Sequence, residues 1–477
     1  MLKNHIASMI KDCLNFDPTD DQQRAINGLS EYVTSNEGDG VFLLKGYAGT
    51  GKTTLVSALV TVLDRMKLNT VLLAPTGRAA KVLSHYSKKS AFTIHKKIYR
   101  QKSLSDEFGV FAMDRNLTPN TVFLVDEASM ISNYSAEASV FGSGRLLDDL
   151  MQYVFSAKNC RLILIGDTAQ LPPIGLDISP ALDPEELESS YNVSVQEVVL
   201  TQVVRQNQES GILMNATSLR AMLNDERTGF PALATENFPD IKRIGGAELI
   251  DEISNAHSEF GLEETIVISR SNKRANKFNQ GIRNTVLYRE EEISNGDYLM
   301  VVKNNYFWAK DIKDMDFIAN GDIVEIVRIH RYTEMYGFRY AEITIRFPDY
   351  KDVEIDTLIL LDTLDIESAS LGYEENKKLF FKIAEDYADI RSKKKRYEKV
   401  RDNKFFNALQ VKFSYAVTCH KAQGGQWKSV FIDQGYLTDE LLTPEYYRWL
   451  YTAVTRATDK LFLVNFKKEF FPNEGEF

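Results

Sequence analysis

A glycine-rich loop directly after an apolar run constrains the fold of this 477-residue chain more than any other feature. The loop, residues 46–53, reads Gly-Tyr-Ala-Gly-Thr-Gly-Lys-Thr and matches the pattern G-x-x-x-x-G-K-[ST]. Residues 41–44 are all apolar, which is typical of a strand buried on both faces of a parallel sheet. Residues 54–66 continue with helical periodicity. This order predicts a phosphate-binding loop inside a parallel α/β domain.

The residue types in this loop suit a nucleoside triphosphate. Glycines let backbone N–H groups close around phosphate oxygens, and the next helix adds its positive N-terminal end. Lys52 is expected to place its charge at the β- and γ-phosphates, and Thr53 to offer a hydroxyl to Mg²⁺. We therefore expect ATP and Mg²⁺ as cofactors. The residues expected at the nucleotide are Gly46, Gly49, Thr50, Gly51, Lys52 and Thr53 of the loop, together with Thr54.

Polar residues also follow two later apolar runs. Asp126 and Glu127 end the run at 121–125, where Asp126 would hold the metal's water shell and Glu127 would deprotonate the attacking water. Gln170 follows the run at 161–165 and is placed to sense the γ-phosphate. Each group has a plainer interpretation, as a solvated strand end or a polar turn.

Two arginines are candidates for stabilising charge on the transferring phosphoryl group. They are Arg205, in the segment 200–206, and Arg456, in the segment 452–457. An isolated arginine is more often a surface residue, so each assignment depends on the rest of the site.

Apolar runs alternate with helical stretches in two groups, which predicts two parallel α/β domains in tandem. The change of texture inside the second group predicts a β-rich insertion with a charged helical arm. A smaller insertion in the first domain has aromatic residues in its centre. The predicted ranges are 1–210 for the first domain, 97–120 for its insertion, 211–477 for the second domain, 301–407 for its insertion and 374–403 for the arm.

Composition argues against several classes of protein. Hydrophobic residues make up 44% of the chain and charged residues 26%, as in ordinary globular proteins, and no apolar run is long enough to span a membrane. Residues 1–16 lack an uninterrupted apolar core, and the three cysteines include no C-x-x-C pair. We therefore expect a cytoplasmic protein with no membrane partner. The net charge of −10 argues against a nucleic-acid coat protein, but it allows one strand to be held in a local groove.

Taken together, the motifs resemble those of superfamily 1 DNA helicases of the RecD-like and Dda-like branch, over nearly the whole chain. Residues 74–80 look like that branch's first DNA-contacting motif and residues 93–95 like its companion. The resemblance implies two RecA-like motor domains, with ATP in the cleft between them and single-stranded DNA across their tops. It implies nucleotide contacts by Gln22 and Gly424, and DNA contacts by Pro75, Thr76, Arg78, His95, Thr418, His420 and Lys421.

The function implied by the resemblance is an ATP-dependent DNA helicase that moves 5′-to-3′ on single-stranded DNA. Its expected partners are single-stranded and forked DNA, with replication or recombination proteins, and the chain is expected to be monomeric. A DNA-stimulated ATPase that does not unwind alone is the alternative. A nucleotide switch or small-molecule kinase would leave Thr76, His95 and His420 without a role.

The small insertion carries Phe108 and Phe111 on either side of Gly109. This spacing suits a hairpin tip whose rings stack on an unpaired base, as a strand-separating pin requires. The alternative is that both rings pack the hairpin against the first domain.

Overall fold

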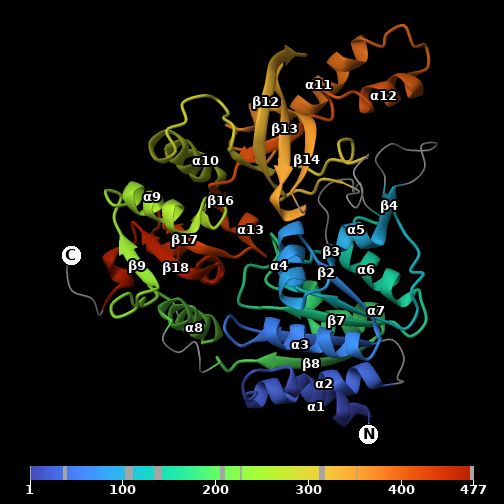
Figure 1. Cartoon of the computed structure of the whole chain (residues 1–477), viewed down its shortest axis with the longest axis vertical. Coiled ribbons are helices and arrows are strands. Elements are labelled where there is room, and N and C mark those ends of the chain that lie inside the picture. Colours follow the sequence, from blue (N-terminus) through green and yellow to red (C-terminus); the bar gives the residue numbers. More distant parts are fainter. Residues whose placement is uncertain are drawn as a thin grey trace.

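The computed structural model describes residues 2–35, 40–101, 111–133, 142–204, 210–225, 228–310, 317–350 and 352–472. Two parallel sheets with helices on their faces lie beside each other, and a β-barrel stands next to both (Figure 1). The predicted fold class, two RecA-like α/β domains in tandem with an insertion in each, is confirmed. Among the described residues no helix is both long and apolar enough to cross a membrane.

The first sheet has six parallel strands in the order β3-β2-β6-β7-β1-β8. Its central strands are buried on both faces: Phe42 and Leu44 of β1 pack into one apolar cluster, and Val41 and Leu43 into the other. The strands are β1 (Gly40–Gly46), β2 (Asn69–Ala74), β3 (Ala91–Thr93), β6 (Thr121–Val125), β7 (Arg161–Gly166) and β8 (Ser194–Leu200).

Helices cover both faces of this sheet. One face is covered by α1, α2 and α3, whose apolar residues share a cluster with β1, and the other by α5, α6 and α7. The helices are α1 (Leu2–Asp12), α2 (Asp20–Thr34), α3 (Lys52–Arg65), α4 (Gly77–Ser87), α5 (Ile94–Ile98), α6 (Leu146–Phe155) and α7 (Pro184–Tyr191). Because the strands are parallel, the polar residues after β1, β2, β6 and β7 meet at one edge of the sheet.

The second sheet has five parallel strands in the order β16-β10-β17-β18-β9. They are β9 (Ile241–Ile244), β10 (Thr265–Ser269), β16 (Ala416–Thr418), β17 (Trp427–Asp433) and β18 (Ala457–Val464). The helices around it are α8 (Gly211–Asn224), α9 (Leu249–Phe260), α10 (Asn272–Gly281), α13 (Cys419–Ala422) and α14 (Pro444–Val454). Helices α8 and α14 pack against each other.

The β-rich insertion is a closed barrel, β11-β12-β13-β14-β15. Its strands are β11 (Tyr298–Val301), β12 (Ile323–Met335), β13 (Phe338–Phe347), β14 (Val353–Leu360) and β15 (Leu409–Phe413). Strands β11 and β15 pair with each other, and they extend the barrel beyond both ends of the predicted range 301–407. The barrel interior and one face of the second sheet form one continuous apolar core.

The predicted charged helical arm, 374–403, consists of two helices, α11 (Tyr373–Glu385) and α12 (Lys393–Arg401). Residues 393–395 are exposed, as expected of a solvated helix face. In the first domain, β4 (Tyr99–Gln101) and β5 (Phe111–Met113) form the predicted hairpin. Phe108 and the side chain of Phe111 lie outside the described residues, so their pin role stays a prediction.

Candidate functional site between the two sheets

The phosphate-binding loop connects β1 to α3. Gly49 and Gly51 have φ angles of 73° and 81°, in the left-handed region that favours glycine. No side chain caps α3, which leaves its first N–H groups available to an anion. The amine of Lys52 donates hydrogen bonds to the carbonyl oxygens of Gly46, at 2.6 Å, and Tyr47, at 2.9 Å. The loop therefore has the geometry to hold phosphate groups, with Lys52 folded over it.

Gln22 packs against this loop from α2. Its side-chain amide donates to the Thr50 carbonyl at 3.0 Å, and its oxygen accepts from the Thr19 N–H, also at 3.0 Å, as part of the cap of α2. The side chain is buried. Gln22 is thus adjacent to the expected nucleotide, and the predicted adenine contact stays a prediction.

Asp126 directly follows the carboxyl end of β6, and β7 lies between β6 and β1 in the sheet. Burial, together with the negative charge of Glu127, raises the pKa of its carboxyl group to about 6, and Lys52 partly offsets this effect. A divalent cation would favour the charged form. Asp126 and Thr53 offer oxygen ligands, which suit Mg²⁺. The described residues contain no group of three or more His, Cys, Asp and Glu that could hold a metal, but Mg²⁺ bound with phosphates and water needs only one or two protein ligands.

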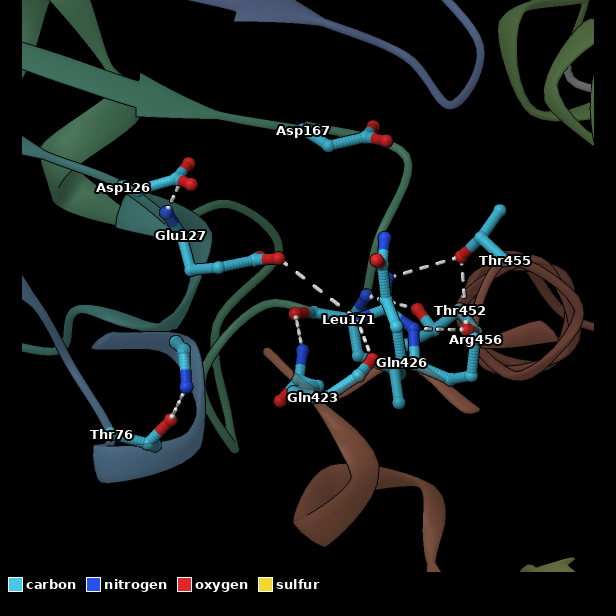
Figure 2. A network of polar contacts seen from close by, with 12 residues as sticks. Thr76, Asp126, Glu127, Asp167, Leu171, Gln423, Gln426, Thr452, Thr455 and Arg456 are labelled. Atoms are coloured by element: carbon cyan, nitrogen blue, oxygen red, sulfur yellow. Dashed lines mark hydrogen bonds and ion pairs between the residues drawn. The ribbon is translucent and has the colours of Figure 1, made fainter. Parts of the chain in front are cut away.

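Glu127 points from the first domain toward the second (Figure 2). Its φ angle is 53°, a left-handed conformation that a residue with a side chain adopts at a cost. A carboxylate oxygen of Glu127 lies 3.9 Å from a guanidinium nitrogen of Arg456. The structure thus brings together two of the predicted catalytic residues, although they are far apart in the sequence.

Arg456 is buried directly after α14. Its guanidinium group donates to the carbonyl oxygens of Thr452, at 3.0 Å, and Gly425, at 3.2 Å, which fixes its direction. Arg205 lies outside the described residues, so its predicted role stays a prediction.

Residues 167–171 of the first domain contact α14 directly. The Leu171 N–H donates to the Thr452 hydroxyl at 2.8 Å, and the Leu171 carbonyl accepts from the Gln423 side-chain amide at 2.6 Å (Figure 2). The Tyr451 hydroxyl donates to Asp167 at 2.7 Å and accepts from the Ala48 N–H at 2.8 Å. Both the phosphate-binding loop and the segment after β7 are therefore held by one helix of the second domain.

Sequence reasoning missed four members of this contact: Asp167, Gln423, Tyr451 and Thr452. The available signal was their position, since three of them lie close to predicted site residues within the motif segments and Tyr451 directly precedes the segment 452–457. Gln170 is buried, and its side-chain oxygen has no hydrogen-bond partner among the described residues. Only the NH2 group of this side chain can donate to a phosphate oxygen, and the predicted γ-phosphate sensing stays a prediction.

A pocket of about 250 Å³ lies between the two sheets and the barrel, and we call it the central pocket. Four of the predicted DNA contacts line it: Thr76, Arg78, His420 and Lys421. The Arg78 guanidinium lies 4.1 Å from the ring centre of Trp427 and donates to the Gln426 carbonyl at 3.1 Å. Burial lowers the pKa of both His420 and Lys421.

The remaining predicted DNA and nucleotide contacts lie elsewhere. Pro75 is in the loop before α4 and Thr418 immediately precedes α13. His95 is partly buried on α5, where burial lowers the pKa of its ring to about 4, and it does not line the central pocket. Gly424 packs against α4, where an added Cβ would lie 2.8 Å from that of Ala79. Its predicted nucleotide contact stays a prediction.

Comparisons with known families cover both domains. Residues 19–238 match the model of an AAA domain, and residues 413–464 match a UvrD-like helicase C-terminal domain. The chain is 24% identical to the helicase Dda of Enterobacteria phage T4, with 94% of this chain and 99% of that protein covered. The ATP-dependent RecD2 DNA helicase of Deinococcus radiodurans is also 24% identical, with 96% of this chain but 53% of that protein covered. These matches confirm the predicted resemblance to superfamily 1 DNA helicases of the RecD-like and Dda-like branch.

Two further matches also cover nearly the whole of this chain. An uncharacterized protein of Acanthamoeba polyphaga mimivirus is 23% identical over 92% of this chain and 98% of that protein. A solved structure concerning two Pif1 helicases at forked double-stranded DNA is 15% identical, covers 96% of this chain and 95% of that chain, and has a TM-score of 0.48.

Proposed function

We propose that this protein is an ATP-dependent DNA helicase that moves along one DNA strand from 5′ to 3′ and unwinds duplex DNA. The observation that carries the proposal is the contact of α13 and α14 with residues 167–171. It connects the phosphate-binding loop to the central pocket through a few hydrogen bonds.

Hydrolysis begins at Glu127, which orients a water molecule and accepts its proton. The water oxygen bonds to the γ-phosphorus of ATP as the bond from that phosphorus to the ADP oxygen breaks, which gives ADP and phosphate. Lys52 and Arg456 stabilise the charge that develops on the transferred phosphoryl group from opposite sides of the cleft. Bound Mg²⁺ would be held by Thr53 and Asp126 and would neutralise phosphate charge. Arg456 stabilises this charge best when the cleft is closed, so hydrolysis depends on the position of the second domain.

Movement of the second domain is then transmitted to the bound DNA strand. The short segment 419–426 carries His420 and Lys421 at the central pocket and Gln423 at Leu171. A shift of α14 that follows the nucleotide therefore moves the strand contacts relative to Thr76 and Arg78. Repeated closing and opening along one strand is translocation.

The boundary between the two motor domains is proposed near residue 210. Strand β8, the last of the first sheet, ends at Leu200, and α8 begins at Gly211 and packs against α14 of the second domain.

A forked-duplex assay tests this function. Substrates with only a 5′ tail, only a 3′ tail or both tails are incubated with ATP and Mg²⁺, and ATP turnover is measured with and without single-stranded DNA. We expect stimulated turnover and separation of the 5′-tailed substrates. Unwinding of the 3′-tailed substrate alone contradicts the direction, and stimulated turnover with no unwinding identifies a translocase.

A further inference from the structure

A second pocket of about 500 Å³ lies between the first domain and the barrel, and we call it the basic pocket. The central and basic pockets share two lining residues, Lys81 of α4 and Asp349 of the barrel. These two residues form an ion pair. The central pocket therefore continues into the basic pocket past one salt bridge.

The charge of the basic pocket differs from that of the whole protein. Asp349 supplies its one carboxylate among the described residues, and the lysines that line it are Lys81, Lys88, Lys89 and Lys96. The chain as a whole has a net charge of −10. Lys88, at the end of α4, is exposed and has no ion pair within the described residues. A positively charged groove in an acidic protein attracts a polyanion locally.

An aromatic side chain stands at the edge of this groove. Phe92 lies on β3, at the edge of the first sheet, and is 38% exposed. The amine of Lys96 lies 5.7 Å from the centre of its ring. A half-exposed ring among lysines is the arrangement with which proteins stack a base and hold the adjoining phosphates, whatever the base.

The basic pocket lies between the central pocket and the hairpin, where a bound nucleic-acid strand could pass. Figure 1 shows β3 between α4 and the hairpin strand β4. A strand that leaves the central pocket on the side of α4 therefore enters the basic pocket before it reaches the hairpin.

We infer that the basic pocket is a further binding site for single-stranded nucleic acid, in which Phe92 stacks one base and Lys88 and Lys96 hold the phosphates beside it. This site rests on the proposed function and adds nucleotides to the length of strand that the protein covers. A phosphate that passes Lys81 competes with Asp349 for its amine, so the ion pair between the pockets opens as the strand passes.

Phe92→Leu and Phe92→Tyr test the site without emptying the position. Leucine keeps apolar volume on β3 but loses the aromatic face, whereas tyrosine keeps it. Tyr373→Leu is a matched control, because Tyr373 is 77% exposed and Lys377, four residues later, lies 5.8 Å from its ring. That pair lies on α11 and lines neither pocket.

Binding is measured by fluorescence anisotropy with oligothymidylates from about four to about 16 nucleotides, the usual range of single-strand sites. We expect Phe92→Leu to match the wild-type protein on the shortest strands that bind and to lose about tenfold in affinity on longer ones. Phe92→Tyr and Tyr373→Leu keep wild-type affinity throughout. Lys88→Ala lowers the salt dependence on long strands by the value for one phosphate, about 0.7, and Lys377→Ala leaves it unchanged.

Equal affinity of Phe92→Leu and wild-type protein at every length overturns the inference while the proposed function stands. An equal loss at every length, or a loss shared by Phe92→Tyr, also overturns it, because the ring would then act on the fold of β3. Absence of binding by the wild-type protein is a failure of the proposed function itself.

Discussion

Replacing Thr452 by valine tests the coupling between nucleotide and strand at one hydrogen bond. The Thr452 hydroxyl accepts from the N–H of Leu171 at 2.8 Å, and both residues are buried. Valine has nearly the shape of threonine but cannot accept, so the N–H loses its partner away from water. An unsatisfied buried donor costs about 1–3 kcal/mol.

That cost applies to the arrangement in which the two domains touch. The population of this touching arrangement, relative to the arrangement with separated domains, therefore falls by about 5- to 150-fold, because about 1.4 kcal/mol corresponds to a tenfold change. We expect DNA-stimulated ATP turnover to fall by about tenfold. Affinity for nucleotide should change little, because Thr452 does not contact the phosphate-binding loop.

Turnover is measured over a range of single-stranded DNA concentrations, and nucleotide affinity by a fluorescent ATP analogue. Thr452→Ser is the control, because it keeps the hydroxyl group and loses a methyl group. Wild-type turnover in Thr452→Val would refute this reasoning. So would an equal loss in Thr452→Ser, since the cause would then be packing within α14.

Four other changes have expected outcomes. Lys52→Ala should abolish ATP turnover, measured by phosphate release, because it removes the charge at the phosphates. Glu127→Gln should bind ATP and Mg²⁺ but hydrolyse slowly, so near-normal turnover contradicts its role as the base. Arg456→Ala should lower kcat more than it weakens nucleotide binding, and an effect on binding alone contradicts the assignment. Burial raises the pKa of Asp322 from 3.8 to about 7. Between these two pH values the folded state binds a proton that the unfolded state lacks. The contribution of this group to the free energy of unfolding therefore falls as the pH rises. Thermal unfolding of Asp322→Asn should therefore lack this part of the pH dependence, which is on the order of 4 kcal/mol at most.

The sequence predicted the parts of the fold that depend on local patterns. Strands β1, β6 and β7 are short apolar runs buried on both faces, and each was found close to its observed bounds. Strand β8 was missed because it lies at the edge of its sheet and is partly exposed, without a clear apolar pattern. The barrel limits were missed because β15 closes the barrel against β11, more than a hundred residues earlier in the chain.

In the candidate site, too, the contiguous motifs were predicted and the contacts between distant segments were not. The phosphate-binding loop and the pair Asp126–Glu127 are contiguous, so their roles follow from residue type and spacing. The contact between Glu127 and Arg456 joins two domains, so neither local segment could predict it. Tyr451 and Thr452 are ordinary polar residues of a helix until the fold places them against Asp167 and Leu171.

Because the barrel and the second sheet share one continuous apolar core, the barrel is packed against the second domain as part of it. The rings of Phe431 and Phe462, on the sheet, stack with centres 4.3 Å apart in the same apolar cluster as Val301 and Ile343 of the barrel. A shortened chain without the barrel would open this cluster to water and should aggregate rather than yield a minimal motor. The barrel also cannot swing freely, because turning it would break that packing. In the proposed cycle, closure of the nucleotide cleft would move the barrel wall over α4, and both pockets would change width.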